Sequence, residues 1–168
     1  MDECIYCKIA IGLIPSYKIY EDNDIIAVLD IFPNAKGNII VMSKKHYEDP
    51  FSIPDEVIGK VFVLSKYLSG IVMQLFKYPG VNLLVNFGKI PGNKQHHFVV
   101  HLMPRFDGDN VKFLIPKNQS NSAELEEVRQ AIIKMLNLNK KEEEKKVEKK
   151  EEKNIDFNEA IKWFYKKI

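Results

Sequence analysis

The chain has 168 residues, 45% of them hydrophobic, which is enough for one domain with a buried core and an appendage. A formal net charge of only +2 does not indicate a nucleic-acid-binding protein, and no apolar run reaches the roughly 18 residues that a membrane span needs. The chain opens without the basic and apolar regions of a signal peptide and carries both cysteines in one C-x-x-C, which predicts a reducing, cytoplasmic setting.

The apolar residues predict short strands arranged around a long helix. Strands are expected at residues 17–21, 25–30, 38–42, 81–86 and 98–103. Helices are expected at residues 54–76 and 121–136, where apolar side chains recur at spacings of three and four. This order predicts an α+β domain over residues 1–138, built on an antiparallel sheet with a long helix and a C-terminal helix.

The tail, residues 139–168, differs in composition. Residues 140–153 hold seven lysines, six glutamates and one valine, a run that cannot bury a core but can form a solvated, charged helix. After it, Phe157, Ile161 and Phe164 recur at helical spacing behind a possible N-cap at Asp156. We therefore expect a terminal amphipathic helix that buries these side chains.

Two cysteines and two of the four histidines could form a zinc site. Cys4 and Cys7 are three positions apart, and His46 and His97 could complete a tetrahedral set of thiolate and imidazole ligands. His96 and His101 are the alternatives to His97. A redox-active cysteine pair, or two free thiols beside unrelated surface histidines, would also fit this spacing, although no βαβ pattern surrounds the C-x-x-C.

The strand expected at 98–103 carries an unusual pattern. Alternate residues on a strand share a face, so the side chains of His97, Val99 and His101 point the same way. The apolar residues between them are expected to face the core. Histidines on both sides of Val99, on the face away from the core, therefore mark a candidate functional face.

Several motifs in order resemble the histidine-triad (HIT) family over about residues 3–136. The amino half of the resemblance is carried by Cys4-Ile-Tyr-Cys-Lys-Ile, Ile14-Pro-Ser, Tyr20-Glu-Asp, Asp30-Ile-Phe-Pro, Gly37-Asn-Ile-Ile-Val and Lys45-His46. The carboxyl half is carried by Asn86-Phe-Gly88, Gly92 and His97-Phe-Val-Val-His101-Leu-Met-Pro-Arg105. The ordered set is far more specific than any one motif.

The resemblance implies a HIT-like fold and nucleotide chemistry. Members like this chain catalyse nucleotidyl transfer or hydrolysis at the α-phosphate of purine nucleoside phosphoramidates or dinucleoside polyphosphates. The middle histidine of the triad attacks phosphorus and forms a nucleotidyl-histidine intermediate. In the zinc-bearing, prokaryotic-type branch, the first triad histidine binds zinc with two cysteines and an earlier histidine, which corresponds to Cys4, Cys7, His46 and His97 here.

The chain departs from the family at the catalytic position, where Val99 replaces the nucleophilic histidine. Valine cannot attack phosphorus or accept a proton, so the chain as it stands is predicted to be inactive. A shift of register does not restore the triad, because it would use His96 on the opposite face of the strand. The alternatives are an enzyme without its nucleophile and a natural pseudoenzyme, or nucleotide-binding interaction module.

Other positions correspond to a nucleotide-binding site. Asp30 corresponds to the acid that binds the ribose hydroxyls, and Asn86 to an amide near the ribose and phosphates. The remaining correspondences are Ile31 and Phe32 near the base, Gly92, Asn93 and Lys94 near the phosphates, and His101 as the third triad histidine. Strand-end packing and a solvated loop lysine are the plainer explanations for Phe32 and Lys94. The family also implies a homodimer.

Overall fold

The computed structural model describes residues 4–47, 49–88 and 97–147 of the chain. The chain divides into two compact units, one from Met1 to Phe113 and one from Leu114 to Ile168. The predicted terminal helix from Asp156 to Ile168 lies outside the described residues. Among the described residues, no helix combines the length and apolarity that crossing a membrane requires.

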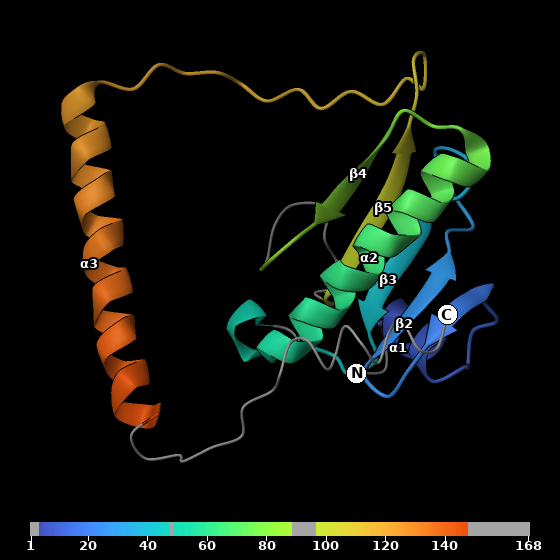
Figure 1. Ribbon diagram of the computed structural model, residues 1–168, viewed down its shortest axis with the longest axis horizontal. Helices are drawn as coiled ribbons and strands as arrows, with labels where there is room; N and C mark the ends of the chain where they lie inside the picture. The colour runs from blue at the N-terminus through green and yellow to red at the C-terminus, as the bar shows by residue number, and fades with distance from the viewer. Residues whose placement is uncertain (1–3, 48, 89–96, 148–168) are drawn as a thin grey trace. The chain divides into compact units, whose positions relative to one another are not determined.

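The first unit is built on a five-stranded antiparallel sheet in the order β1-β2-β3-β5-β4 (Figure 1). The strands are β1 Lys18–Glu21, β2 Ile25–Leu29, β3 Ile39–Ser43, β4 Gly80–Val85 and β5 Val99–Arg105. The helices are α1 Ile5–Ala10 and α2 Asp55–Phe76, with a 3-10 turn η1 at Pro50–Ser52. This architecture confirms the predicted α+β class and each predicted strand to within two residues.

Helices cover both faces of the sheet, and this explains the composition of its central strands. The 22-residue α2 packs on β5, β3, β4 and β2. On that side of the sheet Val41, Val100 and Leu102 are completely buried. The short α1 covers the opposite face. Consequently β2 and β3 are apolar at nearly every position instead of alternating with polar residues.

Arg105, to which no role was assigned from the sequence, holds the turn that follows β5. Its guanidinium donates to the Asp109 carboxylate at 2.5 Å, to Asn82 Oδ1 at 2.5 Å and to the Val111 carbonyl at 2.8 Å. Arg105 and the Val111 amide lower the pKa of Asp109 to about 2. Arg105 therefore fixes the end of the first unit against β4.

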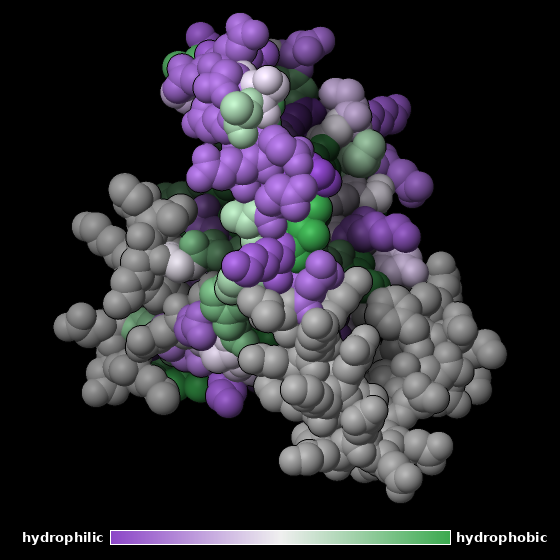
Figure 2. Space-filling view, turned by 90° about the vertical axis from the view of Figure 1, so that its left-hand side faces the viewer, coloured by the Kyte–Doolittle hydropathy of each residue, from purple (hydrophilic) through white to green (hydrophobic). Residues whose placement is uncertain are grey.

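The second unit contains α3, Ser122–Val147. The helix predicted at 121–136 therefore continues into the charged run without a break. Leu125, Val128 and Ile132 form an exposed apolar stripe at spacings of three and four. Figure 2 shows hydrophilic residues over most of the coloured surface on one face of the molecule, with smaller hydrophobic areas between them.

Gly37, in the loop before β3, permits a close approach to α2 that no larger residue would allow. Its φ is +85°, and a Cβ atom would lie 2.8 Å from the Phe76 ring and 3.2 Å from Val72. We expect Gly37→Ala to lower the free energy of unfolding by about 2–4 kcal/mol, from backbone strain and overpacking together. Gly70→Ala is the control, because nothing lies within 4 Å of that Cβ position in α2 and alanine should stabilise the helix by about 0.5–1 kcal/mol. Equal effects of both changes in urea unfolding would contradict this prediction.

Candidate metal centre and ligand-binding face

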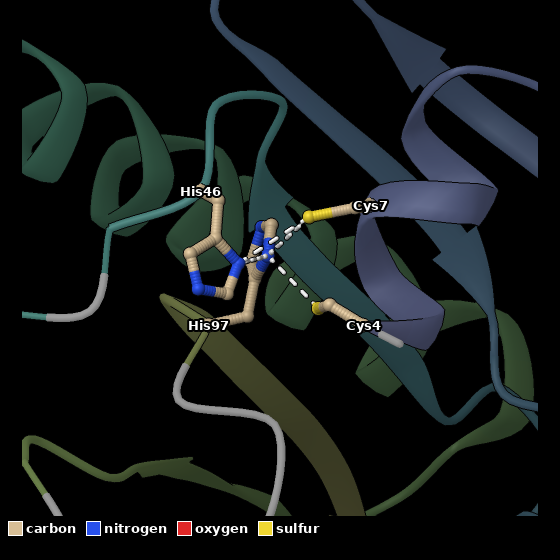
Figure 3. A group of neighbouring side chains, drawn as sticks. All are labelled: Cys4, Cys7, His46 and His97. Atoms are coloured by element: carbon tan, nitrogen blue, oxygen red, sulfur yellow. Dashed lines mark hydrogen bonds between the residues drawn. The ribbon is translucent and has the colours of Figure 1, made fainter. Parts of the chain in front are cut away.

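Four side chains from three separate segments meet at one end of the sheet. Cys4 is the N-cap of α1 and Cys7 lies within it, His46 follows β3, and His97 lies two residues before β5. Their ligand atoms all lie within 4.8 Å of one another, and the side chains point toward a common centre (Figure 3). The pairing of β3 with β5 brings His46 and His97 together, although 51 positions separate them.

The separations match those of a tetrahedral zinc site. With Zn–S about 2.3 Å and Zn–N about 2.0–2.1 Å, a tetrahedron places sulfur and nitrogen about 3.5 Å apart and two nitrogens about 3.3 Å apart. The observed Sγ–Nδ1 distances are 3.5 Å for Cys4–His97, 3.6 Å for Cys7–His97 and 3.3 Å for Cys7–His46. The two Nδ1 atoms are 3.2 Å apart. The four residues thus fit a metal ion of this size and coordination.

Hydrogen bonding orients His97 for this role. Its Nε2 lies 2.7 Å from the carbonyl oxygen of Ser43, to which it donates, so the Nδ1 lone pair faces the cluster. Burial lowers the pKa of His97, which keeps the imidazole neutral as a metal ligand. Burial and the Cys4 side chain raise the pKa of the Cys7 thiol to about 11, so a cation is needed to hold Cys7 as a thiolate near neutral pH.

The predicted ligand set of Cys4, Cys7, His46 and His97 is therefore brought together, and the alternative with His101 is not. His101 lies within β5, opposite Ile40 and Leu84, and takes no part in the cluster. His96, the other alternative, lies outside the described residues. The two cysteines are free thiols.

The sheet face that carries Val99 differs from the expectation. We name it the Val99 face and define it by the side chains of Ile26, Val28, Ile40, Met42, Val99 and His101. The expectation that Val99 faces away from a core is wrong: it is only 7% exposed and belongs to an apolar cluster. Ala10 of α1 is part of this cluster, and Tyr6 and Ile9 of the same helix pack against it. The alternation of side chains along the strand correctly predicted which residues share a face with Val99, but it could not reveal that α1 covers that face.

Two polar groups lie beside this cluster. His101 follows Val99 on the same face of β5, and the Asp30 carboxylate after β2 lies within electrostatic range of it. Burial is the larger effect and lowers the pKa of His101, so the imidazole is neutral near pH 7. Asp30 Oδ1 accepts a hydrogen bond from the Phe32 amide at 2.9 Å, and Oδ2 accepts none from the described residues. An acceptor and a neutral imidazole are thus available at the edge of the face.

The structure describes some of the other predicted nucleotide-binding residues but not all of them. Asn86 is half-buried just after β4, and Gly88 follows with a φ of +77°. Ile31 and Phe32 are largely exposed, so both side chains are accessible to a ligand. Gly92, Asn93 and Lys94 lie outside the described residues.

The role of α1 was missed from the sequence. Tyr6, Ile9 and Ala10 are three and four positions apart, which is a helical spacing, but six residues are too few for periodicity to predict a helix. The Tyr6 ring lies 5.7 Å from the His97 ring, centroid to centroid, and within electrostatic range of Asp30. Tyr6 therefore connects the metal cluster with the Val99 face.

Comparison with protein families gives a match to the HIT domain over residues 12–108. An uncharacterised HIT-like protein of Methanocaldococcus jannaschii is 35% identical over 133 residues, covering 75% of this chain and 98% of that protein. The adenosine 5'-monophosphoramidase of Saccharomyces cerevisiae is 38% identical over 104 residues, covering 62% of this chain and 63% of that enzyme.

Solved structures give the same result. A histidine triad nucleotide-binding protein from Candida albicans superimposes with a TM-score of 0.70 at 28% identity, covering 80% of this chain and 97% of that one. A zinc-bound histidine triad family protein from Mycobacterium smegmatis superimposes with a TM-score of 0.60 at 26% identity, covering 81% of this chain and 96% of that one.

Proposed function

Since this chain belongs to the HIT domain family, we propose that it binds a purine nucleoside monophosphate at the edge of the Val99 face, beside Asp30 and His101, holds zinc in the Cys/His cluster and does not turn over family substrates. Two relatives support the ligand class by their names. The yeast relative is an adenosine 5'-monophosphoramidase, and the Candida protein is called nucleotide-binding. The zinc-bound relative supports the metal. The absence of turnover follows from Val99, which has no lone pair with which to attack phosphorus.

Binding does not require residue 99. The Asp30 carboxylate would accept hydrogen bonds from the ribose hydroxyls, and a carboxylate acceptor makes these bonds stronger than neutral ones. Asn86, with the 92–94 loop, would bind the ribose and phosphate. His101 would donate or accept a hydrogen bond near the α-phosphate. Zinc, with four protein ligands and no open position, would act structurally by joining α1 to the segments that hold His46 and His97.

Titration of the zinc-loaded protein with adenosine 5'-monophosphate (AMP) tests this proposal. We expect one site per chain, and Asp30→Ala should weaken it about 10- to 100-fold, because the change removes hydrogen bonds to a charged acceptor. Asp107→Ala is the matched control, since Asp107 is an exposed carboxylate on the turn after β5. Unmeasurable AMP binding, or equal losses in both variants, would contradict the proposed site.

A natural binding module is the second candidate function. The observation that favours it is the packing of Val99, which fits the apolar cluster under α1 instead of standing as an isolated substitution in a polar site. Such a module would sense a nucleotide and report it to a partner without consuming it. The two candidates differ in the expected response to Val99→His: an enzyme that lacks only its nucleophile should regain turnover, whereas a binding module should stay inert.

We also propose that the protein forms a homodimer in which the β4 strands of two chains pair. We place this homodimer in the reducing cytoplasm. The two edges of the sheet differ in a way that supports this proposal. The β1 edge carries Lys18 and Glu21 and a register irregularity, which hinder pairing with another strand. Strand β4 is regular, uncharged and six residues long, and within the described part of the chain no strand pairs with its outer edge. The free thiols of Cys4 and Cys7, as metal ligands, suit a reducing compartment.

A lysine on β4 should therefore dissociate the dimer. We expect light scattering to give the mass of two chains for the unmodified protein and of one chain for Leu83→Lys. Ile19→Lys on the opposite edge is the control, because Ile19 is 43% exposed and Leu83 is 40% exposed. A monomeric starting protein, or dissociation by both variants alike, would argue against pairing through β4.

A further inference from the structure

The short helix α1 belongs to two sites at once. Cys4 and Cys7 supply both sulfur atoms of the metal cluster. The side of α1 that faces the sheet covers the apolar residues around Val99 with Tyr6, Ile9 and Ala10. Whatever moves α1 must therefore change the metal cluster and the Val99 face together.

Helix α1 has little stability of its own. It is six residues long, the side chain of its N-cap residue Cys4 makes no capping hydrogen bond, and its first turn contains no acidic residue. Isolated helices shorter than about 12 residues are marginal in water even with favourable sequences. The position of α1 therefore depends on what ties it to the sheet.

We propose that metal binding at the Cys/His cluster controls ligand binding at the edge of the Val99 face, beside Asp30 and His101, by holding α1 against the sheet. This inference rests on the proposed nucleotide site. With the metal bound, Cys4 and Cys7 are joined through it to the segments after β3 and before β5. Without it, α1 loses these links, and Tyr6, which packs against the apolar cluster beside the His97 ring and within electrostatic range of Asp30, is held less firmly. Because linkage is reciprocal, nucleotide binding must then strengthen metal binding by the same factor.

The test compares zinc-loaded protein with chelator-stripped protein, using AMP as the probe. We expect stripping to weaken AMP binding about tenfold or more in calorimetry. Hydrogen exchange should accelerate at the amides of Lys8 and Ile11, which donate to the carbonyls of Cys4 and Cys7. Exchange in α2 should stay slow, which verifies that the rest of the first unit remains folded.

Tyr6→Ala separates coupling from metal binding, because it keeps all four ligands. This variant should bind one zinc per chain yet bind AMP more weakly, and stripping it should change the AMP affinity less than in the unmodified protein. Lys8→Gln on the same helix is the control and should behave as the unmodified protein does. If stripping unfolds α2 as well, the Tyr6→Ala result decides the inference.

The outcomes distinguish the inference from the proposed function. Equal AMP affinity with and without zinc overturns the coupling and leaves the nucleotide site intact. Failure of both forms to bind AMP contradicts the proposed function. In that case zinc-dependent protection of α1 still supports the claim that the metal holds this helix, whereas protection that is independent of zinc overturns that claim.

Discussion

Val99→His is expected to convert an inert protein into a nucleotidyl hydrolase. The new imidazole would stand between His97 and His101 on the Val99 face, beside the proposed α-phosphate site. The apolar neighbours Ile40 and Met42 would lower the pKa of the introduced histidine and keep it neutral, which is the state that attacks phosphorus. We expect hydrolysis of a nucleoside phosphoramidate or a dinucleoside polyphosphate, with a transient nucleotidyl adduct on the new imidazole.

The expected effect is large because the nucleophile makes the covalent bond. Removing the nucleophile of another enzyme costs about a million-fold in rate, so restoring one here should raise turnover by several orders of magnitude. The larger side chain should also destabilise the cluster by about 1–3 kcal/mol through overpacking, which thermal unfolding would measure.

Val99→Asn is the control for this prediction, because it introduces a polar side chain of related shape that cannot attack phosphorus. It should bind AMP and remain inert. Mass spectrometry of the Val99→His protein after rapid mixing should detect the adduct. If Val99→His binds AMP yet stays inert on both substrate classes, the chain is a pseudoenzyme that lacks further groups. If the unmodified chain already turns over at ordinary enzyme rates, the nucleophile has been placed at the wrong residue.

Loss of any one of the four cluster ligands is expected to release the metal and destabilise the first unit. Protein purified without added metal should contain one zinc per chain, and Cys4→Ala or His97→Ala should contain almost none. When free zinc exceeds its dissociation constant a thousand-fold, binding adds about 4 kcal/mol to stability, so the melting temperature should fall by many degrees. Acid should release the metal too, since protons compete for the thiolates and imidazoles.

His101→Ala is the matched control for the metal site, because it removes a half-buried histidine on β5 that lies outside the cluster. Its zinc content should equal that of the unmodified protein. Retention of zinc by His97→Ala, or a stoichiometry near zero in the unmodified protein, would be incompatible with the proposed centre. Elemental analysis and thermal unfolding measure both quantities on the same samples.

The sequence alone determined the elements whose residues contact one another locally. Helix α2 was predicted because its apolar side chains recur at helical spacing over 22 residues, and its ends differ from the prediction by one residue at most. The strands were predicted because β-branched and apolar runs are bounded by turn residues. The ligand set of Cys4, Cys7, His46 and His97 was predicted from ligand chemistry and the ordered family motifs, neither of which depends on coordinates.

Tertiary structure alone decided what lies over each face. Val99 was placed on the correct side of its strand, but its burial depends on α1, which lies 89–94 positions away along the chain. Helix α1 has only six residues, too few to show a helical period, and it packs on the sheet through Tyr6, Ile9 and Ala10. Alternation along a strand states which side chains share a face, whereas only the packing of distant segments decides whether that face meets water, a helix or a ligand.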